Sequence, residues 1–244
     1  MELIGLLIIG ALLRILFLLG MERLIKPEKL HKNSILRLVR PDKQHKREWK
    51  IAIRNVFLDT IFLYTFIAVA HGINIAGKLD PWQCAVGLVG HSLTFELMAY
   101  WYHRTEHRFP RLCPWHGKHH SSVIPTPLTS LMFSMSERVF SFMMFVFPMF
   151  VFSQVFGAFP LWLLAVVVAL HDGVNSLVHC NREFTPAVLR NSFFARYIFS
   201  PTHHARHHAG VQGNYGLFVP LYDQIFGTYV KDAVSLEKRT SGAD

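Results

Sequence analysis

Five apolar runs constrain how this chain of 244 residues can fold more than any other feature. They cover residues 3–19, 51–70, 82–102, 139–156 and 161–178. Each run is close to the roughly 20 residues that a helix needs to cross a bilayer. Because 51% of the residues are apolar and only 17% are charged, a disordered chain and an ordinary soluble domain are both disfavoured. The sequence therefore predicts an all-α, polytopic membrane protein with about four to five transmembrane helices.

Charged residues interrupt the first two runs. The first contains Arg14 and is followed by Met-Glu-Arg at 21–23 instead of an A-x-A-like cleavage site, so we interpret it as an anchor helix. The second carries Arg54 and Asp59 near its start, where charges are costly in lipid unless they pair or reach the interface. Residues 157–160, between the last two runs, are predicted to form a tight hairpin connection.

Positive charge is concentrated in residues 21–50, which hold ten of the 25 Lys and Arg residues against four acidic ones. Nucleic-acid binding is one interpretation of such a segment. Apolar runs flank it on both sides, however, and Lys and Arg accumulate on the cytoplasmic side of membranes. We therefore expect a cytoplasmic juxtamembrane loop and no nucleic-acid partner. The chain is expected to divide into an anchor helix with this basic loop at 1–50, a membrane domain at 51–230 and a polar tail at 231–244.

Charge also determines the expected topology. The link at 71–81 has a single basic residue, Lys78, and is placed on the far side of the membrane from residues 21–50. The third run then returns the chain, and the last two runs form a hairpin. Residues 103–138 and 180–244 consequently lie on the cytoplasmic side. The sequence thus predicts a cytoplasmic helical cap that carries the histidine boxes.

Eleven of the fifteen histidines fall between residues 103 and 208, and their spacing is typical of metal ligands. An HxxxH pair presents two imidazoles on one helix face, one turn apart. An HxxHH box presents two imidazoles on one face and a third about 100° away, which can reach a different ion. With one histidine after the fifth run, nine residues are candidate ligands: His103, His107, His116, His119, His120, His179, His204, His207 and His208. Nine ligands are too many for one metal and suit two metals with four or five ligands each.

The remaining histidines have other expected roles. We interpret His31 and His45, in the basic segment, as solvated residues. His71 lies at the end of the second run. His91 lies within the third and is expected to be a hydrogen-bonded core residue. His203 is left open between a metal ligand, a supporting group and neither.

Ligand type alone leaves iron and zinc open, since imidazole suits both. The three cysteines contain no CxxC pair, which argues against a closed structural zinc site. They are also too few for a disulfide scaffold, so we expect reduced thiols.

Several motifs occur in order between residues 90 and 230. They are YWYHRTEH at 100–107, PWHGKHHS at 114–121, VHCN at 178–181, SPTHHARHH at 200–208, NYG at 214–216 and LYDQIFGT at 221–228. Together they resemble the fatty acid hydroxylase / sterol desaturase superfamily of integral membrane di-iron enzymes. Tyr222 stands where tryptophan is common in that family, and this departure leaves subfamily and substrate open.

The resemblance implies two Fe ions, with Zn as a substitute, held by the nine histidines. A tenth ligand is expected from His171, or from a water held by Asn175. The implied activity of residues 51–230 is that of a membrane-bound non-haem di-iron oxidoreductase. It would use O2 and two external electrons to hydroxylate or desaturate an unactivated C–H bond of a lipid, such as a sterol, fatty acyl or isoprenoid lipid. This lipid is expected to arrive from the bilayer.

The electrons are expected from a partner, because the chain has no haem, flavin or Rossmann signature. Cytochrome b5 or a ferredoxin-type donor would fit. Basic residues of the cap offer a docking surface for such an acidic carrier, although positive-inside charge explains them equally well: Arg104, Arg108, Arg111 and Lys118. The expected location is the bacterial inner membrane, or the ER membrane in a eukaryote.

Carboxylates that orient the ligand imidazoles are also expected. The candidates, each with a solvated or capping role as the alternative, are Glu96, Glu106, Asp172 and Asp223. Two other functions remain open. Glu106 keeps a zinc-dependent lipid hydrolase or lyase under consideration, and a non-catalytic, histidine-rich metal-binding membrane protein is the other alternative.

Overall fold

The computed structural model describes residues 2–29, 31–69, 74, 77–122, 124–210 and 212–230, so His71 and the tail at 231–244 lie outside it. The described residues form helices and no β-strand; one isolated bridge joins Ser34 and Arg182. The α-helices are α1 (Glu2–Ile25), α2 (Asp42–Val69), α3 (Pro81–Arg108), α4 (Cys113–His120), α5 (Met135–Phe156), α6 (Leu161–Val178), α7 (Ala187–Arg190), α8 (Pro201–His208) and α9 (Leu221–Ile225). Two 3-10 helices are η1 (Pro127–Leu131) and η2 (Phe193–Tyr197). The all-α prediction is confirmed.

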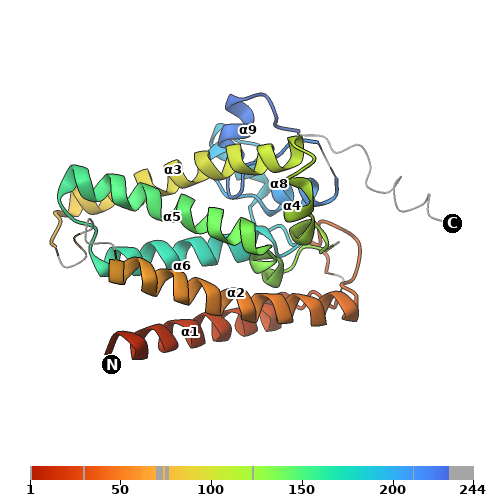
Figure 1. Ribbon diagram of the computed structural model, residues 1–244. Coiled ribbons are helices and arrows are strands. Elements are labelled where there is room, and N and C mark those ends of the chain that lie inside the picture. Colours follow the sequence, from red (N-terminus) through yellow and green to blue (C-terminus); the bar gives the residue numbers. More distant parts are fainter. Residues whose placement is uncertain are drawn as a thin grey trace.

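Five long helices lie alongside one another, and the short helices α4 and α8 gather near one end of them (Figure 1). Helix α9 lies against α3. Among the described residues, α5 and α6 are long and apolar enough to cross a membrane by length and composition. The number of four to five spans and the cytoplasmic side of the cap stay predictions.

Helix α2 begins earlier than its apolar run, because residues 42–50 of the basic segment are helical. Glu48 holds this first half in place, since its buried carboxylate accepts hydrogen bonds from Ser122 at 2.7 Å and Thr126 at 3.0 Å. The expected loop is therefore shorter than 21–50. A polar helical turn that depends on a distant partner leaves no apolar signal in the sequence.

Helices α5 and α6 form the expected hairpin. A Ser134–Glu137 capping box begins α5, and Gly157 ends it with a φ of 78°, a left-handed conformation that favours glycine. Pro148 lies inside α5 and lacks the N–H that the preceding turn needs. The nearby carbonyl of Phe145 accepts a hydrogen bond of 2.8 Å from the ring of His91. His91 is thus a hydrogen-bonded core residue, as predicted.

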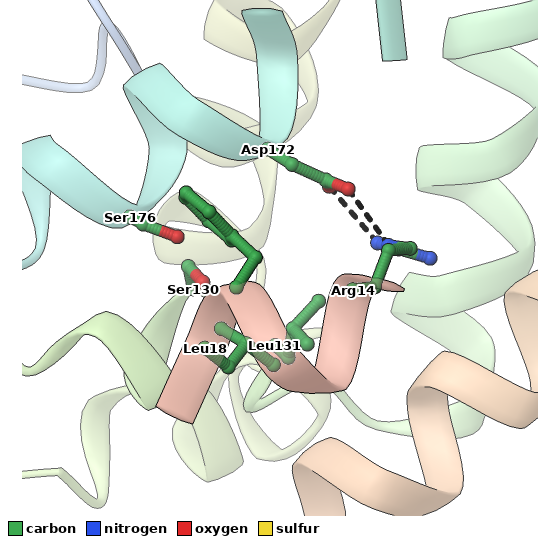
Figure 2. A pocket seen from close by; sticks show the side chains of 7 residues that line it. Arg14, Leu18, Ser130, Leu131, Asp172 and Ser176 are labelled. Carbon is green, nitrogen blue, oxygen red and sulfur yellow. Dashed lines mark hydrogen bonds and ion pairs between the residues drawn. The ribbon is translucent and has the colours of Figure 1, made fainter. Parts of the chain in front are cut away.

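Three of the charges inside the apolar runs pair across four helices, together with Arg138 just before the fourth run. Arg14 on α1 lies 2.8 Å from Asp59 on α2 and 2.7 Å from Asp172 on α6. Arg138 on α5 also binds Asp59. Figure 2 shows Arg14 and Asp172 at the edge of a cavity of about 10 Å³. That volume suits at most about one water molecule, so it cannot admit a lipid.

Candidate metal centre

Four elements bring the candidate ligands together: the last two turns of α3, helix α4, the residue after α6, and helix α8. Proline lies in the first turn of both helices, as the second residue of α4 and the first of α8, where its missing N–H costs nothing. The hydroxyl of Ser200 accepts a hydrogen bond of 3.2 Å from the backbone of His203 and so caps α8. The boxes on α4 and α8 therefore present their imidazoles at regular helical spacing.

The nine histidines separate into two groups. In each group, one ring nitrogen per residue lies within 4.8 Å of those of the others. Cluster one consists of His103, His107, His116, His120 and His207. Cluster two consists of His119, His179, His204 and His208.

Each HxxHH box contributes to both clusters, because the middle histidine points away from the other two. His116 and His120 enter cluster one, whereas His119 enters cluster two. On α8 the assignment is reversed, since His204 and His208 enter cluster two and the intervening histidine enters cluster one. The spacing predicted that one box could contribute to two sites, and in the structure each box does contribute to both clusters.

The Nε2 atoms within each cluster approach one another closely. In cluster one, Nε2 of His120 lies 2.9 Å from Nε2 of His116 and 3.1 Å from that of His207. In cluster two, the corresponding distances are 2.8 Å for His204 and His179, 3.2 Å for His179 and His119, and 3.2 Å for His208 and His204. Neighbouring ligands of an octahedral ion would lie about 3 Å apart with metal–nitrogen bonds of about 2.1 Å.

Backbone carbonyls fix the tautomer of three rings. Nδ1 of His103 donates to the carbonyl of Tyr215 at 2.8 Å, and Nδ1 of His207 donates to that of Gly213 at 2.9 Å. Nδ1 of His179 donates to the carbonyl of Asn175 at 2.7 Å. Because a carbonyl can only accept, the hydrogen is on Nδ1 and the Nε2 lone pair faces the cluster.

The chemistry of these donors fits a metal ion in each cluster. Burial lowers the pKa of His120 to about 3 and those of His107 and His179 to about 4, so these rings are neutral near pH 7. The Nε2 atoms of His103 and His107 are buried without a hydrogen-bond partner among the described residues. Neutral, converging lone pairs need a cation to satisfy them.

Two buried carboxylates lie behind His116 on the side away from the other rings. Its Nδ1 is 2.8 Å from Oε1 of Glu137 and 3.3 Å from Oε2 of Glu106. Burial, followed by the charge of Glu137, raises the pKa of Glu106 to about 8, so Glu106 is largely protonated at pH 7. Sequence reasoning named Glu106 but missed Glu137, whose visible signal was only the Ser-x-x-Glu capping box of α5.

The other three carboxylate candidates do not touch either cluster. Glu96 accepts hydrogen bonds from the backbone of Phe218 at 2.9 Å and Val219 at 3.1 Å. Asp172 pairs with Arg14. Asp223 lies 3.1 Å from Nε2 of His203, which belongs to neither cluster.

Asp223 organises the loop that supplies two of the carbonyl acceptors. It accepts hydrogen bonds from the backbone of Tyr215 at 2.7 Å and Gly216 at 2.6 Å, and from the hydroxyl of Thr228 at 2.7 Å. Burial opposes its ionisation, but His203 and these donors hold the pKa of Asp223 below its usual value. A Cβ on Gly216 would lie 2.5 Å from a backbone oxygen of Val219, so this turn requires glycine.

The structure does not bring His171 to either cluster. Its ring lies among aromatic rings, with centroid distances of 4.5 Å to Phe95 and 5.3 Å to Phe145 and Phe218. The side-chain amide of Asn175 donates to the carbonyl of Ser130 at 3.1 Å. Nine of the ten candidate ligands are therefore gathered, and the tenth is elsewhere.

Comparison with known families identifies the region that carries this arrangement. Residues 88–228, more than half of the chain, match the model of the fatty acid hydroxylase family. The chain belongs to the fatty acid hydroxylase family. All nine clustered histidines of this fatty acid hydroxylase family member lie inside the matched region, as does Glu137. Members of the family are metal-dependent and membrane-associated, and their superfamily is the one that the motifs resembled.

Two curated relatives of this family member come from plants. Very-long-chain aldehyde decarbonylase CER1 of Arabidopsis thaliana is 28% identical over 195 residues, which cover 77% of this chain and 31% of CER1. Very-long-chain aldehyde decarbonylase GL1-6 of Oryza sativa subsp. indica is 31% identical over 197 residues, or 76% of this chain and 29% of GL1-6. The chain thus spans only 29% to 31% of the length of these two relatives. No solved structure matches it.

Two further motif residues of this family member connect segments around the clusters. The side chain of Asn181 accepts a hydrogen bond of 2.7 Å from the backbone N–H of Leu36 and donates one of 3.0 Å to its carbonyl. It thereby ties the segment after α1 to the end of α6. Tyr222 donates a hydrogen bond of 2.9 Å to the carbonyl of Leu93, which holds α9 against α3.

Proposed function

We propose that this chain is an integral membrane di-iron oxidoreductase that oxidises a C–H bond of a lipid with O2 and two electrons from an external carrier. The observation that carries the proposal is the pair of adjacent, buried clusters whose Nε2 lone pairs converge. In this proposal the nine clustered histidines hold two Fe ions, and Zn can replace Fe during expression. His171 is left out of the ligand set because of its aromatic surroundings.

The balanced reaction defines which reactants must reach the site and which products must leave it. Hydroxylation of R–H consumes O2, two electrons and two protons, and yields R–OH and water. Desaturation of a –CH2–CH2– unit consumes the same reactants and yields an alkene and two waters. When bound, the two ions would supply O2 activation and removal of hydrogen from an unactivated C–H bond.

The residues of the chain would supply binding, orientation and exclusion of water. The carbonyls of Tyr215, Gly213 and Asn175 keep three imidazoles in the tautomer that presents Nε2. Burial of the clusters excludes bulk water, which could otherwise take part in competing reactions. Apolar side chains on the outside of α5 and α6 face a lipid environment in this proposal, so a lipid substrate would arrive from the bilayer.

The electron carrier is proposed to be acidic, such as cytochrome b5 or a ferredoxin. Arg104, Arg108 and Arg111 near the end of α3, with Lys118 on α4, would place positive charge close to the clusters. In the same proposal the histidines face the cytoplasm, on the side where Lys and Arg accumulate.

The names of the relatives favour a second candidate. CER1 and GL1-6 are described as very-long-chain aldehyde decarbonylases. By analogy, the chain would convert a long-chain aldehyde R–CHO into R–H and carbon monoxide, with the bond to the carbonyl carbon broken and the aldehyde hydrogen kept on R. The chain spans less than one third of these proteins, so this candidate rests on the matched region alone.

A metal count followed by product analysis tests these candidates. Protein in nanodiscs is reconstituted anaerobically with Fe²⁺, and we expect about two Fe per chain, lost in the double variant H119A/H120A. Reduced protein is then given O2 and either a lipid extract or a long-chain aldehyde. A product that gains oxygen or loses two hydrogens supports the first candidate, whereas a product one carbon shorter supports the second. Wild-type protein without stoichiometric Fe would rule out the di-iron proposal.

A further inference from the structure

The two clusters differ in how many of their rings are held by an acceptor. In cluster one, Nδ1 is hydrogen-bonded in His103, His116 and His207. In cluster two, the corresponding bond is found in His179. The Nδ1 atoms of the other three members are buried and have no partner within the described part of the chain: His119, His204 and His208.

The acceptor of His116 is a carboxylate, whereas the acceptors of His103 and His207 are backbone carbonyls. Glu137 is 1% exposed, and its two oxygens have different partners. Oε1 accepts from Nδ1 of His116 at 2.8 Å, and Oε2 accepts from the backbone N–H of Ser134 at 2.7 Å. The second bond belongs to the start of α5, so the carboxylate cannot turn away from His116 without uncapping the helix.

We propose that Glu137 is a positioning residue that holds His116 in the tautomer with hydrogen on Nδ1, and that cluster one consequently binds its metal ion more tightly than cluster two and before it. The inference rests on the proposed function, in which both clusters hold metal. An acceptor behind a ligand imidazole orients the ring and raises the basicity of the ligating nitrogen, and a carboxylate does so more strongly than a carbonyl.

Replacement of Glu137 by glutamine should favour the other tautomer of His116, with little change in the shape of the side chain at position 137. The single oxygen of the amide would be needed by the N–H of Ser134, which places the NH2 group against Nδ1 of His116. A donor at that position requires Nδ1 to accept, so the hydrogen moves to Nε2 and blocks ligation. If the amide rotates instead, the cap of α5 is lost.

The experiment is a titration of chelator-stripped full-length protein in nanodiscs with Co²⁺, against a competing chelating dye. Wild-type protein should bind two equivalents in two distinct steps. E137Q should weaken the first step by about 10- to 100-fold and leave the second unchanged. S134A is the matched control, because it removes the hydroxyl cap of 3.2 Å at the same helix start without touching His116. Both steps should be unchanged in S134A.

A second pair of variants identifies the tighter cluster without relying on E137Q. H207A disables cluster one, and the remaining equivalent of Co²⁺ should bind with the weaker wild-type constant. H208A disables cluster two, and the remaining equivalent should bind with the tighter constant. The opposite pattern would overturn the inference even if E137Q fails to fold.

The failures of the two proposals are distinguishable. Wild-type protein that binds no Co²⁺ would overturn the proposed metal centre, and this inference with it. Two steps of equal affinity, or an E137Q variant that keeps the wild-type first step, would overturn the role of Glu137 alone.

Discussion

At the scale of single residues, Asp223 is the group that connects the end of the described chain to the metal centre. Its carboxylate receives the N–H groups of Tyr215 and Gly216, and the carbonyl of Tyr215 in turn accepts from His103. One charge therefore determines the shape of a loop and, through it, the tautomer of a candidate ligand.

We expect D223N to lower the free energy of unfolding by on the order of 3 kcal/mol. Asparagine keeps the shape but loses the charge, and its NH2 group meets N–H and O–H donors. Thermal unfolding in nanodiscs measures this change. D80N makes the same substitution at an exposed helix start and should have little effect. Equal stability of D223N and wild type would contradict the role of Asp223.

The clustered histidines also make the metal-free protein sensitive to acid. Their pKa values are lowered by burial in the folded state, whereas an unfolded histidine titrates near about 6.5. The unfolded chain therefore takes up protons that the folded chain excludes, and stability falls as pH drops below about 6.5. Chelator-stripped protein should unfold at a clearly lower temperature at pH 5.5 than at pH 7.5. Glu106 and Glu137 act in the opposite direction, because burial raises their pKa values to about 8 and about 7, but the histidines outnumber them. A stability that does not fall toward pH 5.5 would contradict buried, neutral rings.

At the scale of helices, ion pairs among α1, α2, α5 and α6 determine which helices lie side by side, which the apolar runs alone do not specify. Asp59 binds Arg14 and Arg138, and Asp172 binds Arg14 from the other side. The two arginines and two aspartates sum to zero charge. Each charge is therefore compensated inside the bundle only when the other helices are packed in place.

Removal of one member should be much more harmful than removal of a balanced pair. D59L leaves Arg138, whose side chain is only 12% exposed, without this carboxylate, and we expect a loss of about 3–5 kcal/mol. D59L/R138L removes both charges and leaves Arg14 with Asp172, so it should recover most of that loss. Thermal unfolding of the three proteins in nanodiscs gives the comparison. A double variant no more stable than D59L would contradict the pairing.

The helices and the nine clustered histidines could be predicted because their signals are local. Run length and helical spacing depend on neighbours in the sequence, and both appear in the structure. The start of α2 at Asp42 could not be predicted in this way, since it relies on Glu48 bonding to residues after α4. Glu137 was missed for the same reason, because its bond to His116 joins residues that are 21 positions apart.

At the scale of the whole molecule, α3 offers a test of the prediction that the bundle crosses a membrane. Its 28 residues extend about 42 Å, and free cysteines lie near its two ends. Cys84 is in the first turn, and the exposed Cys113 begins α4 just after the other end.

If α3 spans the bilayer, a membrane-impermeant thiol reagent added to sealed vesicles should label only one of these two cysteines. Vesicles of the opposite orientation should show the reverse pattern. C113S and C84S assign each signal, and Cys180 is buried and should not react. Labelling of both cysteines from one side would exclude a spanning α3.

The carbonyls behind His103 and His207 come from residues more than a hundred positions after the first of those rings. A ribosome that has just synthesised α3 has therefore produced the imidazole of His103 before the carbonyl that orients it. Only when the loop around Gly213 and Tyr215 has emerged and folded back can cluster one take its final form. If the clusters hold iron as proposed, metal capture would then be a late event in biogenesis, and a cell short of iron would accumulate a folded but empty protein.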